Sequence, residues 1–481
     1  MLSSLGRRWW PLGAAVVTGG VVLDGVAHLS SVPVVSAGTG VAVLAAGWWL
    51  LRRPAPLAVV DPGDVAGWLK RLEAMQEQFR QLEDPGAQRF PFRTEAPQLT
   101  APLALAEASP MPSTRPSADL QRAADRRAHR RALALDSQRA LLERSGLTLG
   151  VAATLECPQE RQPLLAQALR GSVPLTLQWS RPLPSWSDSW TWPEPLASAD
   201  ALIYWLRMPL GAADLRWIEA LPPGLPTWLL VEHDEGSEPA ALAEELKAQL
   251  PLGPAHNLLF WSPQATSLQR LLAPLATQLG RRAAALRHDR QLRGLRNLHD
   301  RWQVELEALR RQRFISLQQR TQWLVAAGVV AAPLPSLDLV VLAVANGLML
   351  QEMARLWQCP WTAEQLRAAA LELGRASLAL GVVEWSTQML ASLIKLHGAT
   401  WLVGSAIQAL SAAYLTRVVG RAMADMLALS AGVTEPDLQR IKREAPLLVA
   451  RAAEAEKLDW SGFLQQGQQW WRARQASSAS A

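Results

Sequence analysis

The order of the apolar segments between residues 147 and 280 constrains the fold of this chain more than any other feature. Five short apolar runs, each typical of a buried strand, alternate with segments of helical periodicity. The runs read LTLGVAA, PLTLQW, ADALIYWL, PTWLLVEHDE and NLLFWS, and the predicted helices cover 162–169, 212–221, 239–250 and 266–279. Because crossover helices usually join parallel strands, this alternation predicts an α/β domain with a doubly wound parallel sheet, covered on both faces.

The first strand of this domain is followed by a tight loop and an amphipathic helix, which is the order found in phosphate-binding units. The residues that bind phosphate in such units are replaced here. A P-loop follows the pattern GxxxxGK[ST], in which backbone amides hold the phosphates and the Lys neutralises their charge. Here Ala153 and Pro158 stand at the two Gly positions, and Gln159 and Glu160 replace the Lys and the Ser/Thr. Pro lacks an amide donor, and a carboxylate repels phosphate. We therefore expect no nucleotide cofactor.

The order of these segments resembles that of Era-like GTPases related to translation factors, with each diagnostic motif altered. The stretch WTWPEPLAS lacks the Asp-x-x-Gly that such proteins use for magnesium and the γ-phosphate. At the position of the base-reading NKxD motif stand Glu232, His233, Asp234 and Glu235, of which Glu235 retains an acceptor for a guanine edge. The resemblance implies a degenerate GTPase-like domain over residues 147–280, without turnover.

Two apolar segments at the N-terminus, residues 11–29 and 33–51, are each about 19 residues long, close to the length that spans a bilayer as a helix. A short link joins them, and Arg pairs lie at both outer ends. By the positive-inside rule, this pattern predicts a transmembrane hairpin over residues 1–53 with both ends in the cytoplasm. A cleaved signal peptide is the alternative for the first segment. The expected location is a bacterial inner (plasma) or internal membrane, with the bulk of the chain cytoplasmic.

Residues 54–146 are expected to form a linker with two helices. An amphipathic helix is predicted over Val65–Leu82, and the Pro-rich stretch Gln88–Pro116 is expected to be an unpacked linker. A basic helix follows over Asp119–Glu143 and contains the run RRAHRR. A solvated face and contact with a lipid surface explain this run equally well.

A long Arg-rich helix is predicted over Arg281–Arg320, directly before the apolar C-terminal region. Basic residues at such a place are attracted to anionic lipid head groups. We therefore predict that Arg287, Arg290 and Arg293 lie at a membrane surface. The alternatives are contact with an acidic partner and a solvated helix that only connects two domains.

The region from about Ala326 to Leu429 resembles the YcjF-type membrane-associated domain of unknown function, which is often fused to such GTPases in bacteria, including cyanobacteria. The matching segments are AAPLPSLDLVVLAVANGLMLQEMARLWQ and WLVGSAIQALSAAYLTRVVGRAMADML. The first contains a break formed by Pro333, Pro335 and Asp338. The resemblance implies a helical domain over residues 281–460, followed by a polar tail over 461–481. Whether its helices span a bilayer, lie on it or form a soluble bundle is left open.

The composition excludes several classes of function. The two cysteines have no metal-ligand spacing, and the seven His residues form no HExxH motif, so we expect no metal site and no catalytic centre. The net charge of +6 suits anionic lipids, and no recognised nucleic-acid module accompanies it. The expected partners are membrane lipids and an unidentified protein, without nucleic acid, and self-association is left open. These features indicate a membrane-anchored, pseudo-GTPase-like scaffold or regulatory protein. The alternatives are a noncanonical GTP-binding membrane switch and a component of a channel or transporter.

Overall fold

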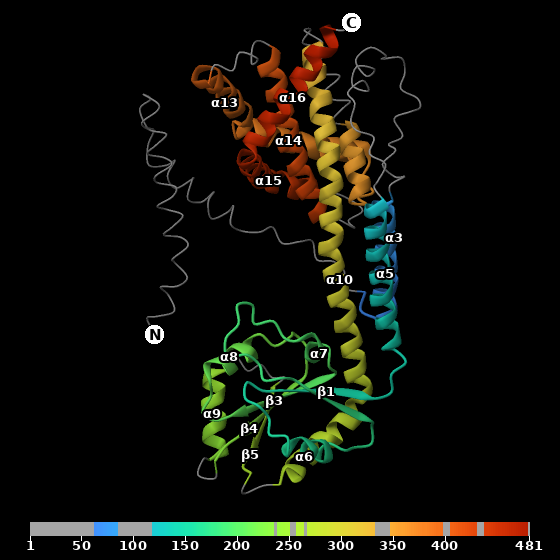
Figure 1. The fold of residues 1–481 in the computed structure, drawn as a ribbon, viewed down its shortest axis with the longest axis vertical. Helices are drawn as coiled ribbons and strands as arrows, with labels where there is room; N and C mark the ends of the chain where they lie inside the picture. The colour runs from blue at the N-terminus through green and yellow to red at the C-terminus, as the bar shows by residue number, and fades with distance from the viewer. Residues whose placement is uncertain are drawn as a thin grey trace. The chain divides into compact units, whose positions relative to one another are not determined.

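The computed structural model divides the chain into two compact units, and each is described by itself (Figure 1). One unit covers Val59–Ser316, and the other includes Leu317–Ala481. The structure describes residues 62–84, 118–234, 238–250, 256–263, 267–331, 347–397, 405–430 and 437–479.

The first unit contains a sheet of five parallel strands in the order β2-β1-β3-β4-β5 (Figure 1). The strands are β1 (Leu147–Ala152), β2 (Leu175–Trp179), β3 (Ala201–Arg207), β4 (Thr227–Glu232) and β5 (His256–Trp261). This is one of the common orders of doubly wound sheets, in which the direction of winding reverses between β1 and β3. The predicted parallel sheet is therefore confirmed.

Helices cover both faces of the sheet because the strands are apolar on both sides. In β3, Ile203 and Trp205 face one core, which also contains Leu165 of α6 (Arg161–Ala168) and the first turns of α10 (Leu268–Ala331). Tyr204 lies in the opposite core. That core is built with α7 (Glu194–Ala197), α8 (Ala212–Glu219) and α9 (Pro239–Gln249). Nearly continuous apolar strands of this kind are typical of parallel sheets buried on both faces.

The helix that follows β5 is one element of 64 residues, α10, and not the two helices predicted over 266–279 and 281–320. Gly280 separates the two predicted helices, and a glycine in a helix costs only about 1 kcal/mol relative to alanine. Leu279 and Ala283 on either side of it are both buried in the same core. Burial of apolar side chains on both sides of Gly280 therefore outweighs the cost of the glycine, and the helix continues.

Two N-terminal helices pack along the middle of α10. They are α3 (Val65–Glu83), at the position of the predicted amphipathic helix, and α5 (Ala118–Ala140), at the position of the predicted basic helix. Asp64 caps α3 by accepting a 2.9 Å hydrogen bond from the amide of Gly67. The shared core consists of Trp68, Leu72, Met75, Phe79, Leu135, Leu295, Leu298, Trp302 and Leu306.

The described residues of the second unit are helical. Besides the end of α10, it contains α12 (Ala363–Ala379), α13 (Val382–His397), α14 (Ser405–Leu429), α15 (Leu438–Leu458) and α16 (Trp460–Ala479). Small residues of α14, such as Ala409, Ala413 and Ala422, are fully buried, so neighbouring helices approach it closely. Thr362 and Asp437 cap α12 and α15 with their side-chain oxygens.

The predicted fold class needs a correction with respect to the membrane. No helix in the described part of the chain is both long enough and apolar enough to cross a bilayer. In α14, for example, Arg417, Arg421 and Asp425 interrupt the apolar sequence. The predicted hairpin over residues 1–53 lies outside the described residues, as do Pro333, Pro335 and Asp338 of the predicted break. The structure therefore supports an α/β sheet with packed helices and does not support a transmembrane hairpin.

The C-terminal residues from 461 onward form most of α16, where a polar tail was predicted. Phe463 is 1% exposed, and its ring stacks on Trp323 of α10 at 6.0 Å between centroids. Trp470 stacks on the same indole at 5.5 Å. The aromatic residues, spaced for one face of a helix, outweigh the polar composition of the segment.

Candidate functional site

The carboxyl edge of the sheet is the place to look for a ligand. In open α/β sheets, ligands bind beyond the carboxyl ends of the strands, where the winding reverses. In this chain the edge is formed by the ends of β1, β3, β4 and β5 and by the loop that leads from β1 into α6.

The backbone amides at the start of α6 are not free to hold phosphate. The amide of Arg161 donates to the carbonyl of Pro158 at 2.9 Å, and the amide of Gln162 donates to that of Gln159 at 3.3 Å. The next residue, Pro163, has no amide hydrogen. Glu160 is the N-cap residue and makes no side-chain capping bond. The amides of Arg161 and Gln162 therefore have partners within the chain, and the loss of a phosphate cradle stays a prediction.

The chain after β2 lies against the loop after β1. Ser180 donates its amide to the carbonyl of Val151 at 3.0 Å, and Leu183 donates to that of Ala153 at 2.8 Å. These bonds continue the β1–β2 pairing past the end of the sheet. Ala153, which was predicted to stand at the first glycine position of a degenerate motif, is therefore held by the neighbouring backbone.

A set of side chains that we call the Glu232 cluster occupies one face of the carboxyl edge. It consists of Glu232, Arg161, Trp205, Arg207 and Trp261. Arg161 Nη1 donates to Oε1 of Glu232 at 2.6 Å, and Trp205 Nε1 donates to Oε2 at 3.0 Å. Arg207 Nη2 lies 3.6 Å from the same Oε2. The guanidinium of Arg161 sits 5.1 Å over the ring of Trp261, which packs edge-on against Trp205.

The cluster holds Glu232 in its charged form. Burial by itself raises the pKa of this carboxyl, but the hydrogen bonds from Arg161 and Trp205 and the charges of Arg161 and Arg207 outweigh it. The pKa of Glu232 is consequently lower than usual. Nearby, burial raises the pKa of the Cys157 thiol, which makes it a poor nucleophile.

A second buried carboxylate, Asp214, lies on the other face of the sheet. Its Oδ1 accepts hydrogen bonds from the hydroxyls of Thr154 at 2.7 Å and Tyr204 at 2.8 Å. Its Oδ2 accepts from the amide of Gly211 at 3.2 Å. Burial and the charge of Asp214 raise the pKa of Tyr204. Asp214 thus ties α8 to β3 and to the loop after β1.

The residues predicted to read a base do not form one site. Glu232 joins the cluster described above, while His233 is buried and extends the β4–β5 pairing by donating its amide to the carbonyl of Trp261 at 3.0 Å. Glu235 lies outside the described residues. Among the residues that the structure describes, no group of three His, Cys, Asp or Glu side chains is placed to hold a metal ion.

The arginines predicted to lie at a membrane surface are placed at the amino edge of the sheet. Arg287 donates to the carbonyl of Ser145 at 2.5 Å, and Arg293 donates to that of Ala199 at 2.7 Å. Arg290 lies 3.8 Å from the buried carboxylate of Asp200, and burial lowers its pKa. These contacts give the arginines an intramolecular role, which is to join α10 to the sheet. The lipid contact stays a prediction.

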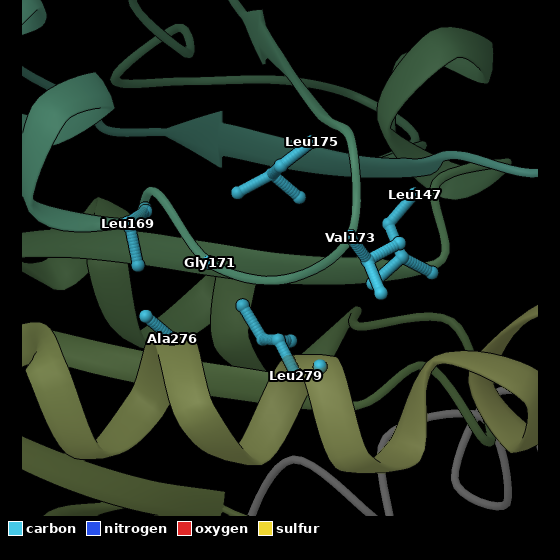
Figure 2. A pocket seen from close by; sticks show the side chains of 8 residues that line it. Leu147, Leu169, Gly171, Val173, Leu175, Ala276 and Leu279 are labelled. Carbon is cyan, nitrogen blue, oxygen red and sulfur yellow. The ribbon is translucent and has the colours of Figure 1, made fainter.

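A small pocket near this amino edge, shown in Figure 2, offers no polar side chain to a ligand. Its lining consists of Leu147, Leu169, Gly171, Val173, Leu175, Ala276, Leu279 and Gly280. Because binding sites need a few placed polar groups to orient a ligand, the carboxyl edge is the better candidate site.

Sequence reasoning selected Glu232 but missed its partners. Arg207 and Trp205 are ordinary strand residues in sequence, and Arg161 is the residue directly after the degenerate motif. The position of Arg161, directly after the segment predicted as a degenerate phosphate-binding motif, was the available signal.

Comparison with known proteins identifies the region after the sheet. Residues 293–453, about a third of the chain, match a family model described as "Domain of unknown function (DUF697)". No curated protein and no solved structure matches the chain. The match begins within α10 and ends within α15. It confirms the resemblance to a YcjF-associated domain in this region of the chain. Residues 293–453 are therefore a DUF697 domain, a YcjF-associated type whose function is unknown.

Proposed function

We propose that the sheet domain is a GTPase-like module that does not turn over nucleotide and acts as a scaffold or regulatory unit for a protein partner. The main observation behind this proposal is that polar groups at the carboxyl edge of the sheet are bonded to other groups of the chain. The first amides of α6 are bonded to the carbonyls of Pro158 and Gln159, and Arg161 is bonded to Glu232. Groups that would bind phosphate in a nucleotide switch are thereby engaged within the chain.

Phosphoryl transfer depends on charges positioned around the transferring group and on a bound magnesium ion. Arg161 carries a suitable charge, but in the free protein its Nη1 is engaged in a 2.6 Å hydrogen bond to the buried carboxylate of Glu232. Asp214 carries a suitable negative charge for a metal, but its oxygens accept bonds from Thr154, Tyr204 and Gly211. Binding GTP at this edge would require breaking several of these contacts.

Calorimetric titration of the full chain with GTP and magnesium tests the proposal. We expect no binding heat at micromolar protein, whereas an active P-loop GTPase titrated in the same buffer serves as the positive control. The triple variant Pro158→Gly, Gln159→Lys, Glu160→Ser is also expected to show none, because Pro163 and the Arg161–Glu232 bond remain. Micromolar, magnesium-dependent binding by the wild-type chain would contradict the proposal.

A further inference from the structure

The Glu232 cluster contains more positive than negative charge. Two guanidinium groups, those of Arg161 and Arg207, face a single carboxylate. A third donor, Nε1 of Trp205, points at the same carboxylate from 3.0 Å. The arrangement therefore presents three donors and two positive charges around a position that holds one negative charge.

The two arginines remain open to solvent although the carboxylate does not. The side chain of Glu232 is 11% exposed, whereas those of Arg161 and Arg207 are 26% and 44% exposed. Two of the three donors, Arg161 and Trp205, also have support that does not depend on Glu232. Arg161 lies over the ring of Trp261, and Trp205 packs against that same ring.

The cluster lies where parallel sheets bind ligands. Arg207, Glu232 and Trp261 are the last residues of β3, β4 and β5, and Arg161 is the first residue of α6. This is the carboxyl edge of the sheet, on the face that α6 and α10 cover.

From these observations we propose that Arg161, Arg207 and Trp205 form a binding site for a small phosphate-bearing molecule, and that Glu232 occupies this site in the free protein. A phosphate monoester carries up to two negative charges and three terminal acceptor oxygens, which match two guanidinium groups and one indole N–H. Glu232 supplies one charge and two oxygens. It competes well in the free protein because it is part of the chain and so has a high effective concentration.

The site differs from a P-loop in chemistry, since its donors are side chains and not the amides of a glycine-rich loop. The inference rests on the proposed function in one respect, namely that no nucleotide with magnesium occupies the carboxyl edge. Its ligand is expected to bind without magnesium.

Titration of the full chain with inorganic pyrophosphate, in a buffer free of phosphate and magnesium, tests the inference. Glu232→Gln removes the competing charge and keeps the side-chain shape, so we expect its pyrophosphate dissociation constant to be about tenfold lower than that of the wild type, or lower still. The double variant Glu232→Gln, Arg161→Gln is expected to lose this gain. Inorganic phosphate should bind in the same rank order but more weakly.

A matched control is available on the same domain. Glu219 pairs with Arg216 on the exposed surface of α8 at 2.9 Å, so Glu219→Gln makes the same change in net charge away from the site. This variant is expected to bind pyrophosphate no better than the wild type. If Glu232→Gln does not fold, Glu232→Asp, which withdraws the carboxylate by one methylene, is expected to show a smaller gain in the same titration.

Two results would overturn the inference: no gain in the folded Glu232 variants, or an equal gain in Glu219→Gln, which would show a nonspecific effect of charge. These results leave the proposed function unaffected. GTP binding by the wild-type chain with magnesium would contradict the proposed function instead, so the two failures are distinguishable.

Discussion

At the scale of single residues, the surroundings of Glu232 show how the fold accommodates a charged group at the end of a buried strand. A carboxylate at the end of a buried strand is costly unless it is paired and hydrogen-bonded. Arg161, Arg207 and Trp205 supply both kinds of partner. Glu232 is thereby the centre of an internal cluster of charged and hydrogen-bonding side chains.

The lowered pKa of Glu232 leads to a prediction about pH. A carboxyl whose folded pKa is below its unfolded value contributes stability above the unfolded pKa, and this contribution is lost as the pH falls through the folded pKa. The difference in unfolding free energy between the wild type and Glu232→Gln should therefore be constant near neutral pH and shrink below the usual range of Glu. Urea unfolding at a series of pH values, in phosphate-free buffer, measures it.

The comparison isolates Glu232, because every other titrating group is shared by the two chains. Glu219→Gln again serves as the control, and its difference from the wild type should be small at every pH, since exposed pairs contribute little. A wild-type advantage that persists unchanged at the acid end would show that the ion pair does not hold the charged form of Glu232.

At the scale of elements, Arg131 of α5 joins three helices. It is 4% exposed and donates to Glu83 of α3 at 2.9 Å and to Glu305 of α10 at 2.7 Å. Its guanidinium also lies 3.7 Å from the centroid of the Phe79 ring. Although burial opposes it, these bonds lower the pKa of Glu83, so the carboxylate depends on its arginines to stay charged.

Removing Arg131 should therefore destabilise the packing of α3 and α5 on α10. Breaking one side of a buried ion pair typically costs about 3–5 kcal/mol, and Arg127 remains beside Glu83, so we expect Arg131→Ala to fall at the low end of this range. Hydrogen exchange in α3 and α5 measures the local effect. The exposed neighbour Arg130 is the control, since Arg130→Ala should change stability by less than about 0.5 kcal/mol. Equal protection in the two variants would refute a joining role for Arg131.

At the scale of the whole molecule, the DUF697 match and the packing of the helices do not have the same limits. The match ends at residue 453, whereas the second unit continues through α15 and α16. Within that unit, Phe463 contacts Trp323, Tyr414 and Trp460. The aromatic cluster around Phe463 therefore needs residues beyond the matched range.

This difference predicts how fragments behave. A fragment of residues 293–453 lacks α16, so Trp323 loses Phe463 and Trp470, and Tyr414 keeps Trp385 but loses Trp460 and Phe463. A fragment of 293–479 retains all of these contacts. Loss of a buried Phe side chain alone typically costs about 3–5 kcal/mol. We expect the shorter fragment to unfold at a lower temperature and to bind a hydrophobic dye. Similar melting temperatures for the two fragments would show that α16 is dispensable.

The sequence by itself determined the parallel sheet, its five strands and the absence of a GxxxxGK[ST] pattern after the first strand. These features depend on local periodicity and on residue types at fixed spacing, which are readable along the chain. The tertiary structure decided the rest. Whether Gly280 ends a helix depends on packing on both sides of it, and whether α16 is a polar tail depends on the aromatic neighbours of Phe463.

The partners of the charged residues were likewise decided only in three dimensions. Arg161 and Glu232 are far apart in sequence and meet because parallel strands bring their carboxyl ends to one edge. Arg287 and Arg293 have the same basic character in sequence whether they face lipid or the carbonyls of Ser145 and Ala199. Charge is a property of the residue, but its partner is set by the fold, since hydrogen bonds and ion pairs act only over a few ångströms.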